Sequence, residues 1–182
     1  MSALAGRDKT ALLVIDVQNG VVQNAFRRDQ VIANINAAVA KARHSEVPVI
    51  WVQHSDSEMP IDSEPWQIVS ELIPLEGESR IRKTFRSSFE GTELADLLSN
   101  LAVGHLIVCG AETNNCVRHT SQDALSKGFD VTLIADAHTT TSYDWDGHSV
   151  SAQAVIDEQN DNFNEVLPGR FARSVVLEKL NL

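Results

Sequence analysis

Two cysteines, at positions 109 and 116, are the candidate nucleophiles of this chain. Cys116 follows a short apolar run, residues 106–109, and a turn in which Thr113 or Asn114 can cap a helix that continues to Gly128. A thiol in the first turn of that helix meets unpaired N–H groups and the positive end of the helix dipole. We therefore expect Cys116 to ionise more readily than a free thiol, which suits nucleophilic attack. Position alone leaves open that Cys116 is a small buried filler.

Cys109 ends the apolar run itself, and no helix terminus is directed at it. Packing is therefore its expected role. Two cysteines seven residues apart across one strand-to-helix turn are unlike a disulfide framework. Both are expected to be thiols in a reducing compartment.

Asp16 follows a continuous apolar run, residues 11–15, of the length of a strand. A strand that is apolar at every position is buried on both faces, as in a parallel sheet, and the carboxyl ends of such strands face the ligand crevice. Asp16 therefore stands where a catalytic group would stand, or else it bonds its own loop. Gln18 either hydrogen-bonds a substrate or shapes the turn.

Residues 80–84 are typical of a short edge strand. A dense basic cluster lies on this strand and just after it. Its members are Arg80, Arg82, Lys83 and Arg86. Either the cluster is a solvated strand end, or it supplies one catalytic cation and attracts an anionic substrate. Composition alone does not distinguish Lys83 from its neighbours.

Three segments, in the same order, resemble the isochorismatase-like cysteine hydrolases. Residues 110–117 (GAETNNCV) match the nucleophile segment GxxTxxCV, residues 12–20 (LLVIDVQNG) resemble the first strand with its aspartate, and residues 82–94 (RKTFRSSFEGTEL) resemble the lysine segment. The resemblance spans residues 11–163 and implies a catalytic triad of Asp16, Lys83 and Cys116.

The resemblance implies an enzyme that hydrolyses a small amide, ureide or N-carbamoyl compound through a covalent acyl-enzyme. Cys116 would attack, Asp16 would take its proton, and Lys83 would favour the ionised forms of both, so that the three titrate as one coupled unit. One alternative is isochorismatase proper, which cleaves an enol ether, although relatives performing that reaction generally lack the cysteine. Another is a thiol redox or binding protein that keeps the fold without hydrolase activity.

Acyl transfer also needs backbone N–H groups directed at the developing oxyanion. Relatives place a non-proline cis peptide before the nucleophile, which maps here to Ala111–Glu112. The resemblance therefore implies an oxyanion hole built from the N–H groups of Glu112 and Cys116. Thr113 would brace the turn through its hydroxyl.

Four further side chains are candidates for the substrate pocket: Gln18, His54, Phe85 and Thr113. Phe85 is either a pocket wall or a core residue, and the core is the expected place. Nicotinamidase-like relatives place an aspartate and two closely spaced histidines after the second strand, whereas residues 53–56 (QHSD) hold one histidine. We therefore expect no metal and no cofactor.

Buried runs that alternate with helical periodicity predict one three-layer α/β/α domain over residues 1–182. The expected strands are residues 11–15, 48–52, 80–84, 106–109, 130–135 and 173–177. The expected helices begin at Asp29, after Thr92 and at Thr113 or Asn114, and a last one spans residues 147–162 and buries Val150, Ala154, Val155 and Phe163. The resemblance implies a mostly parallel sheet with strand order 3-2-1-4-5-6, which places Asp16 and Cys116 on either side of the switch point.

The long segment 53–79 predicts a lid or an interface, with a short amphipathic helix around residues 66–72. Its apolar content predicts a homo-oligomer, a dimer or a tetramer. The net charge of −10 argues against binding the phosphate backbone of a nucleic acid. The resemblance implies a small-molecule substrate as the partner. No apolar run is long enough to span a bilayer, and the first residues are too short for a signal peptide; we expect no membrane partner and a cytoplasmic location.

Overall fold

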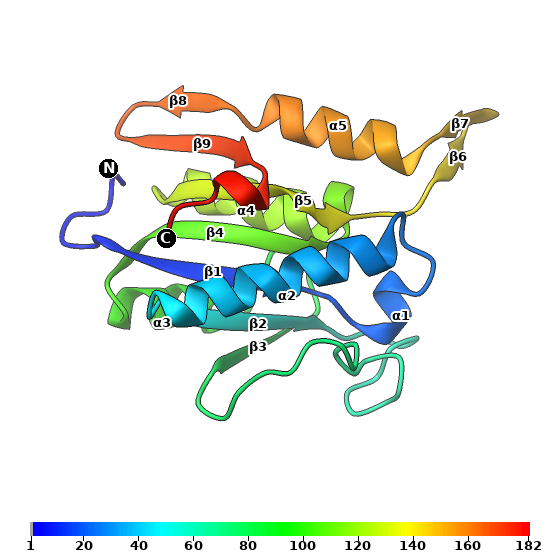
Figure 1. The fold of residues 1–182 in the computed structure, drawn as a ribbon, viewed down its shortest axis with the longest axis horizontal. Helices are drawn as coiled ribbons and strands as arrows, with labels where there is room; N and C mark the ends of the chain where they lie inside the picture. The colour runs from blue at the N-terminus through cyan, green and yellow to red at the C-terminus, as the bar shows by residue number, and fades with distance from the viewer. Residues whose placement is uncertain (1) are drawn as a thin grey trace.

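A computed structural model describes residues 2–182 and is built on a seven-stranded sheet of order β3-β2-β1-β4-β5-β9-β8 (Figure 1). The strands are β1 (Lys9–Ile15), β2 (Val49–His54), β3 (Ser79–Lys83), β4 (Val103–Ala111), β5 (Asp130–Thr139), β8 (Glu165–Leu167) and β9 (Arg170–Val175). The α-helices are α1 (Asn19–Val22), α2 (Arg28–His44), α3 (Leu94–Asn100), α4 (Arg118–Ser126) and α5 (Ala152–Asn162).

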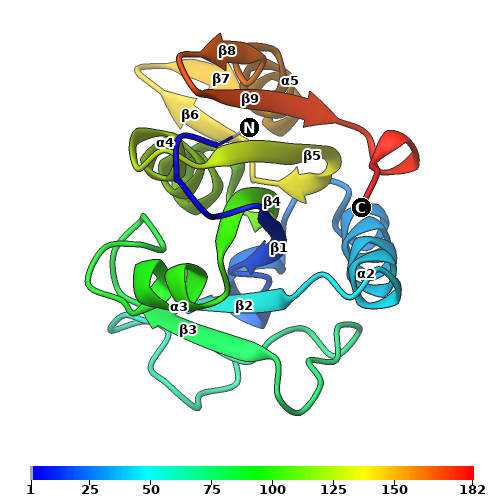
Figure 2. The same ribbon diagram turned by 90° about the vertical axis from the view of Figure 1, so that its left-hand side faces the viewer.

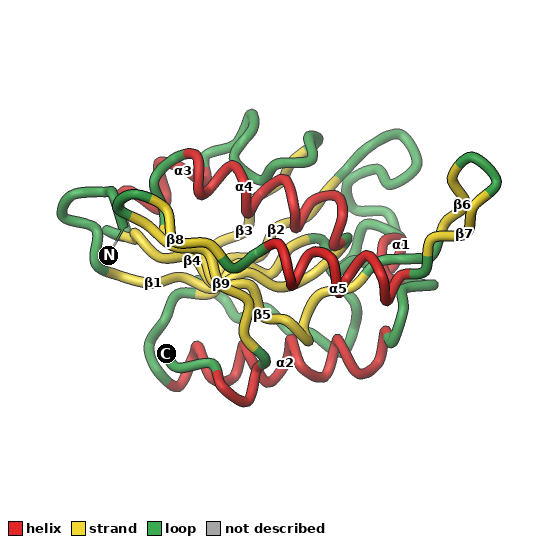
Figure 3. Tube along the Cα trace, turned by 90° about the horizontal axis from the view of Figure 1, so that it is seen from above, coloured by secondary structure: helices red, strands yellow, loops and turns green. Residues whose placement is uncertain are grey.

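The expected order 3-2-1-4-5-6 is confirmed for the parallel part of the sheet, in which β9 is the sixth strand. β8 was not predicted; it pairs with β9 antiparallel and extends that edge. A separate hairpin of β6 (Tyr143–Trp145) and β7 (His148–Val150) was not predicted either, and it projects beyond the sheet in Figure 3. In the part of the chain that the structure describes, no helix is long and apolar enough to cross a membrane.

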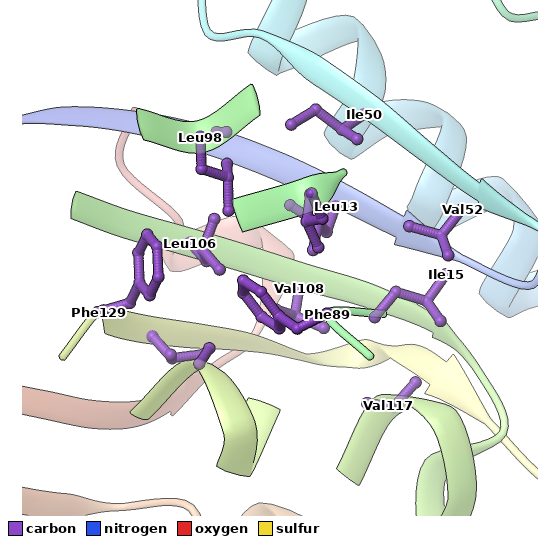
Figure 4. Close-up of a cluster of buried hydrophobic side chains, with 14 of the residues drawn as sticks. Leu13, Ile15, Ile50, Val52, Phe89, Leu98, Leu106, Val108, Val117 and Phe129 are labelled. Atoms are coloured by element: carbon purple, nitrogen blue, oxygen red, sulfur yellow. The ribbon is translucent and has the colours of Figure 1, made fainter. Parts of the chain in front are cut away.

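Each central strand carries apolar side chains on both faces, because helices cover both sides of the sheet. On one face Leu13 and Ile15 of β1 pack in a cluster with residues of α3 and α4, as Figure 4 shows. On the other face Leu12 and Val14 pack in a cluster with α2. Figure 2 shows α2 on the side of the sheet opposite to α3 and α4, which confirms the three-layer architecture.

Gly110 allows β4 to lie against β1 at the carboxyl end of both strands. It pairs with Ile15 and has a φ of +122°, and a Cβ atom there would lie 2.0 Å from the Ile15 carbonyl oxygen. Only glycine fits this close approach. The two chain segments therefore leave the sheet side by side, one into Asp16 and the other toward Cys116.

The predicted helix over residues 147–162 is wrong in its first turn. Asp146 and Gly147 both have positive φ values, 48° and 77°, which suits the tight turn of the β6–β7 hairpin. The helix begins only after Ser151, whose hydroxyl caps it by accepting from the Ala154 N–H. Val150 is consequently half-buried in β7, and Ala154 is exposed, whereas Val155 and Phe163 are buried as expected.

The segment 55–78 contains no helix, so the short helix predicted around residues 66–72 is wrong. It is an irregular loop, and Trp66, Val69 and Leu72 anchor it by burying their side chains within the chain. Ile73 and Leu75 remain 70% and 50% exposed. The loop therefore buries only part of its apolar surface within the chain.

Candidate active site

Asp16, Lys83 and Cys116 meet at the carboxyl end of the sheet. Asp16 comes directly after β1, Lys83 ends β3, and Cys116 lies in the turn after β4. The Lys83 Nζ lies 2.6 Å from the Asp16 Oδ2 and 3.1 Å from the Cys116 Sγ. Lys83 is therefore the central member of the group, in contact with both the acid and the thiol.

Lys83 and Asp16 form an ion pair that is closed to solvent, with side chains 0% and 1% exposed. Burial raises the pKa of the Asp16 carboxyl, and the nearby Lys83 ammonium opposes that rise. Lys83 also donates to the Phe85 carbonyl oxygen at 3.2 Å. The Cys116 thiol also interacts with the Asp16 carboxylate, so Asp16 stands where it can take the thiol proton.

The expectation that Cys116 ionises more readily than a free thiol is wrong. Burial and the adjacent Asp16 carboxylate raise the pKa of the Cys116 thiol to about 12, and Lys83 only partly opposes them. The position near a helix start does not lower the pKa of this thiol, because the tertiary structure removes the sulfur from water. Cys116 therefore rests as a thiol and needs a base to become a nucleophile.

Residues 112–117, here called the nucleophile turn, carry Cys116 between β4 and α4. The Ala111–Glu112 peptide bond is cis. Residues Thr113–Val117 form a wide helical turn in which Asn115 departs from helical geometry, with φ −115° and ψ −107°, and regular α4 begins only at Arg118. A regular helix from Thr113 or Asn114 was expected, so this part of the prediction is wrong.

A cavity of about 620 Å³ opens beside Asp16, Lys83 and Cys116. Its walls are formed by Asp16, Gly20, Val21, His54, Asp56, Glu58, Met59, Thr84, Arg86, Glu112, Asn115 and Cys116. Three acidic side chains on these walls, those of Asp56, Glu58 and Glu112, lie outside the triad. Of the basic cluster, only Arg86 lines the cavity, since Arg82 lies over the Trp66 ring.

Two of the four predicted pocket residues are structural braces. Gln18 is fully buried, and its amide nitrogen donates to the carbonyl oxygens of His54 and Trp66 while its oxygen accepts from the His54 N–H. Its polar atoms join the end of β2 to the loop 55–78, so the substrate-contact prediction is wrong. Thr113 is likewise fully buried and hydrogen-bonds His138 rather than lining the cavity.

The other two pocket candidates differ in outcome. His54 lines the cavity, as predicted, and its Nε2 lies 3.3 Å from the Asp56 Oδ2. Phe85 lies neither in the core nor on the cavity wall, because its side chain is 50% exposed. What Phe85 contributes near the site is its backbone carbonyl, the acceptor for Lys83.

Metal-ligating side chains do not gather at the cavity. Among residues 2–182, no group of three or more His, Cys, Asp or Glu side chains is placed to hold a metal ion. The Asp56 carboxylate is instead used by its own loop, accepting from the N–H groups of Glu58 and Met59.

Met59 and Asn115 lie on the cavity wall but were not predicted from the sequence, whereas Arg86 belongs to the basic cluster that could attract an anionic substrate. Asn115 lies within the nucleophile segment and carried a signal, since it stands next to Cys116. Met59 carried none, because only the folded path of the loop 55–78 brings it to the crevice.

Comparison with known proteins places this geometry in a family. A model described as "Isochorismatase domain" matches residues 10–169. The chain is 32% identical over 145 residues to streptothricin hydrolase of Streptomyces noursei, covering 76% of this chain and 58% of that protein. It is 41% identical over 81 residues to N-carbamoylsarcosine amidase of Arthrobacter sp, covering 44% of this chain and 31% of that protein.

Solved structures agree with the sequence matches. A crystal structure described as an isochorismatase, from Pseudomonas putida, superposes with a TM-score of 0.86 at 27% identity and covers 97% of this chain and 92% of that one. The chain spans less than two thirds of the length of both enzymes above, while the family model extends over most of the chain, from β1 to the turn before β9. The chain therefore belongs to the isochorismatase family.

Proposed function

We propose that this chain hydrolyses a C–N bond of a small amide, ureide or N-carbamoyl compound through a covalent intermediate on Cys116. The observation that carries the proposal is the position of Lys83, whose Nζ contacts both the Asp16 carboxylate and the Cys116 sulfur beside an open cavity. The names of two relatives, a streptothricin hydrolase and an N-carbamoylsarcosine amidase, support hydrolysis of this bond type.

In the first half-reaction the Cys116 Sγ adds to the substrate carbonyl carbon while Asp16 takes the thiol proton. The negative charge moves to the carbonyl oxygen, where the N–H groups of Glu112 and Cys116 are the proposed donors. The C–N bond then breaks, and the leaving nitrogen takes the proton from Asp16. A thioester on Cys116 and a free amine or ammonia result.

In the second half-reaction a water molecule adds to the thioester carbonyl as Asp16 accepts one of its protons. The C–S bond breaks, Asp16 returns the proton to the sulfur, and an acid leaves. The raised pKa of Asp16 suits this role, because its carboxylate is a stronger base than that of an exposed aspartate. Lys83 stabilises whichever of its two neighbours carries the negative charge.

The proposal extends to the state of the molecule in the cell. Three exposed side chains on the loop 55–78, those of Ile61, Ile73 and Leu75, support a homo-oligomer, since such apolar surface favours association. Light scattering that gives a mass near 20.0 kDa at micromolar concentration would contradict it. Both cysteines are free thiols, which supports a reducing, cytoplasmic location.

A substrate screen tests the reaction. Small amides, ureides and N-carbamoyl compounds are incubated with the protein, and release of ammonia or amine is measured. Cys116→Ser and Asp16→Asn are expected to lose at least 1,000-fold in rate, on the order of the loss of a catalytic-triad member. Cys109→Ser is the matched control, because its sulfur is fully buried away from the cavity. Activity that survives Cys116→Ser would refute the covalent mechanism.

A further inference from the structure

We propose that His138 is a positioning residue that holds the nucleophile turn in place through Thr113. This inference rests on the proposed function, since the position of the turn matters for turnover only if Cys116 attacks a substrate. His138 belongs to β5 and has no place in the triad or on the cavity wall. Its side chain is 1% exposed.

A continuous chain of hydrogen bonds runs from the nucleophile turn to α5. The His138 Nδ1 lies 2.9 Å from the Thr113 Oγ1, and its Nε2 lies 3.1 Å from the Asn160 Oδ1. The Asn160 Nδ2 in turn donates to the Ala135 carbonyl oxygen at 3.0 Å. This series of hydrogen bonds therefore begins at Thr113 in the nucleophile turn and ends at the backbone of β5, in the central sheet.

The direction of every bond in this chain follows from its last member. The Ala135 carbonyl can only accept, so the nitrogen of the Asn160 amide must face it and the amide oxygen must face His138. The Ser174 hydroxyl, 2.6 Å away, also donates to that oxygen. The His138 Nε2 must therefore carry a hydrogen. In the neutral ring Nδ1 is then an acceptor, and the Thr113 hydroxyl donates to it.

The histidine is suited to this role because it stays neutral. Burial lowers the pKa of His138 to about 4, although Asn160 and the Asp136 carboxylate oppose the effect. A protonated ring would present hydrogens at both nitrogens and could not accept from Thr113. The Thr113 hydroxyl therefore donates to the buried His138 ring. This bond holds Thr113 in place between Glu112 and Cys116, three positions before the sulfur.

The same helix holds the other end of the turn. The Arg118 Nε, two residues after Cys116, donates to the Gln159 Oε1 at 2.7 Å, and Gln159 is the neighbour of Asn160 in α5. Gln159 is itself buried. Consecutive residues of α5 therefore anchor the turn before and after the nucleophile, which keeps the Cys116 sulfur within reach of Lys83.

The test replaces His138 by leucine, which removes both hydrogen bonds, and Thr113 by valine, which removes only the donor. Each variant is expected to lower kcat by about 100-fold with KM within about twofold, because a small misplacement of the reacting group costs that much. Alkylation of Cys116 by iodoacetamide should slow as well, since a displaced sulfur loses the Lys83 contact. The double variant should be no slower than His138→Leu, because His138→Leu already breaks the Thr113–His138 hydrogen bond that Thr113→Val removes. His138→Asn keeps an acceptor near the Nδ1 position and should recover part of the rate.

His105→Leu is the matched control. His105 is also a mostly buried ring whose nitrogens face two hydroxyls, those of Thr10 and Thr132, but it lies near the amino end of β4. Its removal should lower the free energy of unfolding and leave kcat and the alkylation rate unchanged. Wild-type kcat and alkylation in a folded His138→Leu or Thr113→Val protein, or an equal loss in His105→Leu, would overturn the inference. The rate of Cys116 alkylation reports the position of the sulfur even if no amide proves to be a substrate. Failure of the proposed function can therefore be told apart from failure of this inference.

Discussion

Replacing Lys83 by methionine removes a charge from the interior and leaves the Asp16 carboxylate buried beside a thiol. The two charged atoms lie 2.6 Å apart. At an effective dielectric constant of about 20, their attraction is about 6 kcal/mol, and much of it offsets the cost of taking both groups out of water. Loss of one partner leaves that cost uncompensated, so the free energy of unfolding should fall by about 3–5 kcal/mol at pH 8.

The pH dependence of that loss has a definite sign. Lys83 lowers the pKa of Asp16, so in Lys83→Met the folded-state pKa rises further above its ordinary value of 3.8. A carboxyl with a raised folded-state pKa takes up a proton on folding, and the folded state loses stability as the pH rises through that pKa. The variant should therefore be closer to wild type at pH 5 than at pH 8.

Urea unfolding at the two pH values measures this effect, and hydrolysis and Cys116 alkylation are followed in parallel. The double variant Asp16→Asn/Lys83→Met is the control: its neutral pair should recover most of the stability and none of the activity. Single and double variants that are equally stable at pH 8 would refute the buried ion pair as the source of the effect. Retention of hydrolysis by Lys83→Met would refute the role of Lys83 in the reaction.

Three further outcomes are expected. Limiting iodoacetamide at neutral pH should modify Cys116 before Cys109, because Cys109 is fully buried and burial raises the pKa of its thiol; preferential labelling of Cys109 would contradict the assignment of the nucleophile. Dialysis against EDTA should leave activity unchanged, and a loss that zinc or iron restores would show that the protein uses a metal. Stability should fall as the pH drops from 6.5 to about 4, because the pKa values of His105 and His138 are lowered to about 4 and the unfolded chain takes up the protons first. Each histidine accounts for up to about 3 kcal/mol, so His105→Leu should show a shallower decline, and an equal slope would count against this explanation.

The sequence by itself determined the layout of the chemistry. The uninterrupted apolar run before Asp16 and the run before Gly110 predicted buried parallel strands, and strand ends in such sheets share one edge. The alternation of residues in β3 also distinguishes Lys83 from its basic neighbours. Ile81 and Lys83 share the buried face of the strand, while Arg80 and Arg82 face outward. Period-two burial is a local property, so it can be read before the fold is known.

Tertiary structure alone decided the environment of each group. The thiol of Cys116 looked acidic from its place in the chain, yet burial by distant segments and the Asp16 charge raise its pKa. Gln18 looked like a substrate contact, yet its amide is used by His54 and Trp66, which lie 36 and 48 residues away. Solvent exclusion and hydrogen-bond partners depend on what the rest of the chain brings to a site. Local sequence therefore specified which groups reach the crevice, and packing specified their protonation and their freedom to bind a substrate.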